Sequence, residues 1–253
     1  MSSRQAGKDA LRDRSAAWLA ALLVVVILGW LGWSRVARLP LRDVTVEGAV
    51  MAHADRLLAL ARLESDSLLV SVSPSMVDDR VSRHPWVREA RTNRLPDGTV
   101  SIRVTERTPV LLVLSASGRP EYYVDRDGHR MPYEAGHAFP VPVLRGFTEP
   151  YHPVRVVRNS SIRELVAVIP DLEPEVNALL SEFRYSTATG VDLVTTPTPT
   201  GETLGVHLGR SGFRTRFERL EAFWDQAVLT RPGVRYTSVD LRFDGQIITR
   251  ESS

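Results

Sequence analysis

Cysteine is absent from this 253-residue chain, and lysine occurs only once, as Lys8. Without cysteine the chain has no disulfide framework, no catalytic thiol and no cysteine-based zinc site. The single lysine excludes the S-x-x-K arrangement of penicillin-binding-type acyl transfer, and no G-x-S-x-G nucleophile motif is present. A glycine-rich phosphate-binding loop is missing too. We therefore predict that the protein is not an enzyme and has neither catalytic residues nor a cofactor.

Histidines and acidic residues give only weak metal signals. None of the six histidines shows H-E-x-x-H or H-x-H spacing. His129 and His137 are close in sequence, which leaves a metal pair as a minor alternative. Residues 125–128 (DRDG) resemble the start of a calcium loop but lack the later bidentate glutamate. The pattern favours a hairpin turn, and we predict no metal site.

The excess of positive over negative charge lies at the N-terminus. The first 14 residues hold four of the 32 basic and two of the 30 acidic residues, which leaves 28 of each for the rest. The sequence pI near 9.2 therefore does not indicate a nucleic-acid-binding face. We predict no nucleic-acid partner.

One long apolar run, residues 15–34, contains no charged side chain among its 20 residues. As a helix it would reach about 30 Å, the thickness of the hydrocarbon core of a bilayer. Trp18, Trp30 and Trp33 lie towards its ends, where indoles favour the interface. A cleaved signal peptide is the alternative, but small residues are missing where cleavage would need them. The run predicts one transmembrane helix with a cytoplasmic N-terminal tail.

The residues that follow predict a small α+β unit. Residues 41–48 alternate between apolar and polar side chains and end at glycine, as a half-buried strand does. Two helical patterns follow, and then two strand patterns are joined by turn residues 95–98 (LPDG). The expected element order is β-α-α-β-β.

From Pro109 onward the pattern changes to strands separated by glycine turns, with two short helices at 162–169 and 175–180. Residues 213–229 form the strongest helical pattern, with aromatic and aliphatic residues at three- and four-residue spacing. A final strand pair is expected at 239–243 and 246–250. The last strand carries neither proline nor lysine, so we expect an open sheet edge that accepts a partner's strand.

Several motifs, taken in order, resemble the FtsQ/DivIB family of bacterial cell-division proteins. The resemblance covers the chain from the apolar run to Arg250. The matching segments are VTVEG at 44–48, HPWV at 84–87, RLP at 94–96, IRV at 102–104, ERTPV at 106–110, VDRDG at 124–128, PVLRG at 142–146, VHLGR at 206–210 and YTSVDLRFD at 236–244.

The resemblance implies a single-pass membrane protein with a POTRA domain and a β-rich domain outside the cytoplasm. The implied segments are a cytoplasmic tail (1–14), a transmembrane helix (15–34), a connector (35–40), a POTRA domain (41–108), an FtsQ-type β domain (109–250) and a C-terminal tail (251–253). It also implies a location in the plasma (inner) membrane at the division septum.

The family's function implies a scaffold that links early and late division proteins and regulates septal peptidoglycan synthesis. The implied partners are FtsB and FtsL homologues, together with other membrane proteins of the divisome. Two alternatives stay open at this stage: another POTRA-bearing envelope assembly or secretion factor, and a membrane-anchored cell-wall enzyme.

In family members the C-terminal strand pairs with a strand of FtsB, and a preceding arginine and aromatic contribute. The matching partner-binding residues here are Arg242, Phe243, Asp244, Gly245, Gln246, Ile247, Ile248, Thr249 and Arg250. Some members carry a tryptophan near the end of this region, and this chain does not. Either this aromatic anchor is missing here or another residue supplies it, and Tyr236 is the candidate for the second case.

Overall fold

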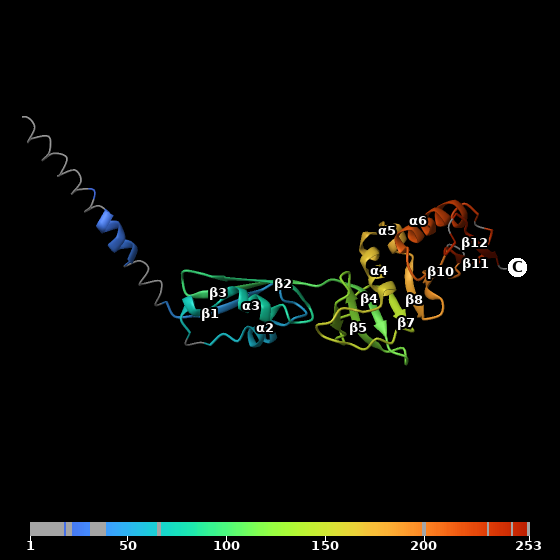
Figure 1. The fold of residues 1–253 in the computed structure, drawn as a ribbon. Helices are drawn as coiled ribbons and strands as arrows, with labels where there is room; N and C mark the ends of the chain where they lie inside the picture. The colour runs from blue at the N-terminus through green and yellow to red at the C-terminus, as the bar shows by residue number, and fades with distance from the viewer. Residues whose placement is uncertain are drawn as a thin grey trace, which may run out of the picture. The chain divides into compact units, whose positions relative to one another are not determined.

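The chain is described by a computed structural model (Figure 1), which contains two compact units. The residues that the structure describes are Trp18, 22–30, 39–64, 67–198, 201–231, 233–243 and 245–251. The first unit holds the described part of Met1–Ser82 together with Glu89–Thr105. The second unit holds Arg83–Arg88 and the described part of Glu106–Ser253.

The predicted membrane span is described only in part. Trp18 and residues 22–30 are helical, whereas the other residues of 15–34, the tail 1–14 and connector residues 35–38 lie outside the described ranges. Within those ranges no helix combines the length and the apolar character that a bilayer crossing needs.

The first unit has the predicted β-α-α-β-β order. Its elements are β1 (Asp43–Glu47), α2 (Ala54–Ala61), the short 3-10 helix η1 (Leu69–Ser71), α3 (Pro74–Val81), β2 (Val87–Arg94) and β3 (Thr99–Glu106). The strand order is β1-β3-β2, and β1 runs parallel to β3. A parallel pair needs a crossover connection, and the two helices between β1 and β2 supply it.

The core of this unit follows from the two periodicities of its sequence. Val100, Ile102 and Val104 are buried at alternate positions of β3. Leu57 and Ala61, four residues apart in α2, are fully buried, and α2 contacts both α3 and β1. The buried stripe of the helices and the buried face of the strands therefore form one apolar core.

The second unit is built on a nine-stranded sheet with the order β12-β11-β10-β9-β8-β7-β4-β5-β6. Its strands are β4 (Pro109–Leu114), β5 (Pro120–Asp125), β6 (Arg130–Pro132), β7 (Val143–Arg145), β8 (Leu180–Ser186), β9 (Gly190–Thr195), β10 (Gly205–Gly209), β11 (Tyr236–Asp240) and β12 (Ile248–Glu251). The chain after Pro109 is therefore β-rich, as predicted.

Helices of the second unit bury their apolar faces in the same core as the sheet. They are α4 (Ser160–Val168), the 3-10 helix η2 (Ile169–Asp171), α5 (Pro174–Asn177) and α6 (Phe213–Phe223). Glu164 of α4 accepts hydrogen bonds from the amides of Gly212 (2.7 Å) and Phe213 (3.1 Å). A carboxylate at this position satisfies free amides at the start of α6 and complements the helix dipole.

The long C-terminal helix is not α-helical throughout its predicted length of 213–229. It changes at Trp224 to a π-helical segment, η3 (Trp224–Val228), in which the amide of Leu229 donates to the carbonyl of Trp224 at 3.0 Å. The wider turn shifts the residues beyond it around the helix axis. Val228 is buried, whereas Leu229 is 52% exposed.

Candidate functional site

The last strand, β12, forms one edge of the nine-stranded sheet and is paired on one side, with β11, within the described chain (Figure 1). The pair is antiparallel, with Val239 opposite Thr249 and Asp240 opposite Ile248. An edge strand presents backbone amides and carbonyls that a further strand can use. The final strand pair predicted from the sequence is therefore present, and its outer side lies at a sheet edge.

The bounds of this strand differ from the sequence prediction of 246–250. Gln246 and Ile247 lie in the connection before the strand, and Glu251, which we had assigned to the C-terminal tail, lies within it. Gly245 has a positive φ of 79°, a left-handed conformation that glycine adopts readily. The turn at Gly245 precedes the strand, which begins at Ile248 rather than at Gln246. Asp244 lies outside the described residues.

Three large apolar side chains near this edge are exposed. Phe243 is 44% exposed, Ile247 39% and Ile248 46%. Gln246 and Arg250 are exposed beside them, and Thr249 is half-buried. Exposed apolar residues gathered on one surface are typical of a protein-binding site. These described residues of the predicted site are therefore exposed in or next to the edge strand, and their contact with a partner stays a prediction.

Tyr236, the predicted aromatic anchor, is mostly buried and borders a groove. Its side chain is 7% exposed, and its ring packs edge-on against Phe223 with centroids 5.1 Å apart. The ring belongs to the core and also borders a groove of about 370 Å³ between η3 and β12. The groove is lined by Ala222, Phe223, Gln226, Ala227, Arg231, Tyr236, Ile247, Thr249 and Glu251.

Arg242 is held by an intramolecular ion pair with Asp240. Nε of Arg242 donates to Oδ1 at 2.9 Å, and Nη2 donates to Oδ2 at 2.5 Å. This hydrogen bonding lowers the pKa of Asp240 and raises the pKa of Arg242. The guanidinium also lies 5.8 Å from the ring centre of Phe243. Arg242 therefore orders the turn before β12, so a partner's carboxylate would have to compete with Asp240 for it.

We expect Asp240→Asn to flatten the acid dependence of stability. The folded-state pKa of Asp240 is below its unfolded value of about 3.9, so the stabilisation is present above that pH and is lost as the pH falls through the folded pKa. Because Arg242 is 39% exposed, we expect an effect below about 1 kcal/mol.

Urea unfolding at about pH 6 and pH 2.5 measures this change in the free energy of unfolding. Exposed Asp225, changed to Asn, is the control, and equal pH dependence in both variants would contradict the role of the pair.

Two contributors to this site were missed by the sequence analysis. Asp240 orients Arg242, and Arg219 of α6 donates to the carbonyl of Phe243 at 3.0 Å. The spacing of Asp240 and Arg242, two residues apart in an alternating segment, is a signal that could have identified the first. No local signal indicates Arg219, because its contact spans 24 residues of sequence.

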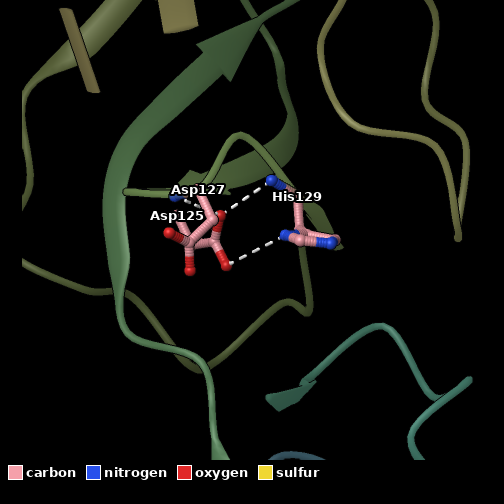
Figure 2. A group of neighbouring side chains, drawn as sticks. All are labelled: Asp125, Asp127 and His129. Atoms are coloured by element: carbon pink, nitrogen blue, oxygen red, sulfur yellow. Dashed lines mark hydrogen bonds and ion pairs between the residues drawn. The ribbon is translucent and has the colours of Figure 1, made fainter. Parts of the chain in front are cut away.

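A second cluster, Asp125, Asp127 and His129, lies in the turn between β5 and β6 (Figure 2). One ligand atom from each lies within 4.8 Å of the others, a geometry able to hold a metal ion. Figure 2 shows the Asp125 carboxylate facing the amide and the ring of His129, with an Oδ2–Nδ1 distance of 3.6 Å.

The contacts of Asp125 show that its carboxylate stabilises the turn. Oδ1 accepts from the amides of Asp127 (3.0 Å) and His129 (2.7 Å), and Oδ2 accepts from Nη1 of Arg107 at 2.8 Å. The positive charge of the Arg107 guanidinium therefore balances the negative charge of the buried Asp125 carboxylate. Burial, followed by the charge of Arg107, lowers the pKa of His129. The turn thus matches the hairpin predicted for residues 125–128.

Comparison with known protein families divides the chain in two. Residues 39–107 match the model "POTRA domain, FtsQ-type", and residues 108–250 match "FtsQ/DivIB, C-terminal related". The second match alone covers more than half of the chain.

Individual relatives agree with these matches. The chain is 38% identical over 248 residues to the cell division protein FtsQ of Rhodothermus marinus, covering 98% of this chain and 91% of the relative. It is also 38% identical over 248 residues to FtsQ of Salinibacter ruber, covering 96% and 94%. FtsQ of a Geobacter species is 26% identical over 239 residues, covering 88% and 82%.

Proposed function

The chain belongs to the FtsQ/DivIB family of cell division proteins, and we propose that it is a non-enzymatic scaffold of the divisome. In this role it links early and late division proteins and regulates septal peptidoglycan synthesis. The observation that carries the proposal is the edge of β12, with exposed Phe243, Ile247 and Ile248 beside it. Main-chain hydrogen bonds along an edge give affinity, and apolar side chains beside it give specificity.

The proposed partners are FtsB and FtsL homologues, and other divisome membrane proteins are further partners. A strand of the FtsB homologue adds to β12, and its side chains contact Phe243 and the groove between η3 and β12. The binding site that we propose comprises Tyr236, Arg242, Phe243, Asp244, Gly245, Gln246, Ile247, Ile248, Thr249 and Arg250.

We also propose the topology that this role requires. Residues 1–14 lie in the cytoplasm, residues 15–34 cross the plasma membrane, and the connector 35–40 leads to the POTRA domain (41–108) and the β domain (109–250) outside. The uncharged 20-residue run supports the span. The protein then acts at the division septum.

Replacing Phe243 with serine tests the proposed site. We expect the full-length variant to capture its FtsB–FtsL pair about tenfold more weakly, because a half-exposed aromatic that a partner buries contributes about 1–2 kcal/mol. Co-purification followed by titration of the partner pair measures this loss.

Val154→Ser is the matched control. Val154 is 61% exposed and lies in the loop after β7, and four strands separate β7 from β12 in the sheet. Equal binding by the two variants would exclude the proposed site. A wild-type chain that does not capture the partner pair at all would contradict the scaffold function itself.

A further inference from the structure

Three segments of the first unit meet at the end of the unit where the chain enters it. The amide of Leu69 donates to the carbonyl of Leu39 (2.9 Å), and the amide of Leu41 donates to Ser67 (2.9 Å), so residues 39–41 pair with residues 67–69. The amide of Arg42 donates to the carbonyl of Gly98 at 2.9 Å, which adds the turn between β2 and β3. An added Cβ at Gly98 would lie 3.0 Å from the carbonyl oxygen of Pro40.

This end of the unit exposes aliphatic side chains that its fold does not bury. Leu68 is 47% exposed, Val70 42% and Leu95 39%, whereas Leu69 between the first two is 5% exposed and anchors the segment in the core. Arg94 donates from Nη1 to the carbonyl of Val70 at 3.0 Å, which ties the end of β2 to η1. The three exposed side chains therefore lie on neighbouring segments, and we call them the entry-end patch.

Charged groups surround the patch in an arrangement that suits a lipid interface. Arg42 and Arg94 are exposed and have aliphatic stems that can lie along apolar surface while the guanidinium stays in water. Two acids lie nearby: Asp43, which follows Arg42 and lies opposite Thr99, and Asp97, which accepts from the amide of Thr99 at 2.9 Å. That hydrogen bond lowers the pKa of Asp97, and the charge of Arg42 contributes.

The covalent chain limits how far this patch can lie from the proposed membrane span. Four residues (35–38) lie between Ser34, the end of the apolar run, and Leu39, so five Cα-to-Cα steps join the two. They reach at most about 18 Å when fully extended. The headgroup region on each side of a bilayer is roughly 5–8 Å thick. The patch is therefore within reach of the headgroups, and the adjoining chain leads directly to them.

We propose that the entry-end patch of Leu68, Val70 and Leu95 contacts the lipid surface and holds the first unit against the membrane. This inference rests on the membrane anchoring included in the proposed function. The contact is interfacial: aliphatic side chains enter the boundary between headgroups and acyl chains, and the two arginines face lipid phosphates.

Single-cysteine labelling tests this contact cleanly, because the chain has no cysteine of its own. Full-length Leu68→Cys, Leu95→Cys and Val50→Cys variants are labelled with an environment-sensitive fluorophore. They are then reconstituted into phosphatidylcholine–phosphatidylglycerol vesicles that contain a lipid with a nitroxide near its headgroup. Val50 is the control, because it is 72% exposed and follows the opposite end of β1.

We expect nitroxide quenching to be about twofold stronger at positions 68 and 95 than at position 50, since apolar groups at an interface enter by about 5–10 Å. Vesicles without the anionic lipid show whether the arginines contribute. Equal quenching at all three positions in chains that float with the vesicles would overturn the patch inference alone. Chains that do not float would overturn the anchoring and the patch together. Unchanged circular dichroism confirms that the labelled variants fold.

Discussion

Proline at the β12 position whose amide faces outward is expected to weaken capture of the FtsB–FtsL pair at least about tenfold and to leave the fold intact. Amides along an edge strand point alternately towards the paired neighbour and outward. Of Ile248→Pro and Thr249→Pro, one therefore removes an outward amide that the partner's strand needs, and the other removes a bond to β11. Proline is tolerated at sheet edges when its missing amide faces outward.

Two measurements separate these variants. The outward variant keeps the melting temperature of the wild type but binds the partner pair at least about tenfold more weakly, because it loses a backbone hydrogen bond and places a ring against the added strand. The inward variant melts at a lower temperature. Val154→Ser is again the control, since Val154 is exposed and lies outside the proposed site. Wild-type binding by a stably folded variant at both strand positions would rule out strand addition at β12.

The largest expected change in stability comes from Asp125→Ala. Asp125 is 4% exposed at its side chain and Arg107 is 11% exposed, so the substitution leaves an arginine largely buried without its counter-charge. It also removes the acceptor for the amides of Asp127 and His129. Losing one partner of a buried ion pair costs about 3–5 kcal/mol. Urea unfolding followed through Trp86 and Trp224, both in the second unit, measures the change.

Two further variants identify the cause. Asp127→Ala is the exposed control, because its ion pair with Arg88 spans 3.7 Å at the surface and contributes little. In the double variant Arg107→Met, Asp125→Leu, most of the lost stability is expected to return if the buried, uncompensated charge causes the loss. A double variant as unstable as Asp125→Ala would instead assign the loss to the two amides of the turn.

Much of the fold was predictable because it depends on local, periodic patterns. The β-α-α-β-β order of the first unit, the hairpin turn at 125–128 and the final strand pair all follow from side-chain alternation and turn residues. The π-helical change at Trp224 was not predictable, because the apolar spacing of 213–229 is equally compatible with an uninterrupted α-helix.

The candidate site also has features that the sequence predicts and features that only the structure shows. The sequence predicts Phe243, Ile247 and Ile248 as site residues, and the structure leaves each of them exposed in or next to β12. The role of Tyr236 as an anchor stays a prediction: its ring packs against Phe223 in the core and also borders the groove beside β12. The contact of Arg219 with the carbonyl of Phe243 required the structure, since it joins residues 24 positions apart.

The sequence by itself identified the family through its ordered motifs. It also determined the two folded regions and the element order of the first, because alternation, helical spacing and turn residues act over a few neighbouring positions. Only the tertiary structure decided which strand lies at the edge and which side chains near it stay exposed. Strand order and burial depend on contacts between segments far apart in the chain, such as β10 with β11 and Arg219 with Phe243. Those contacts leave no periodic trace in the sequence.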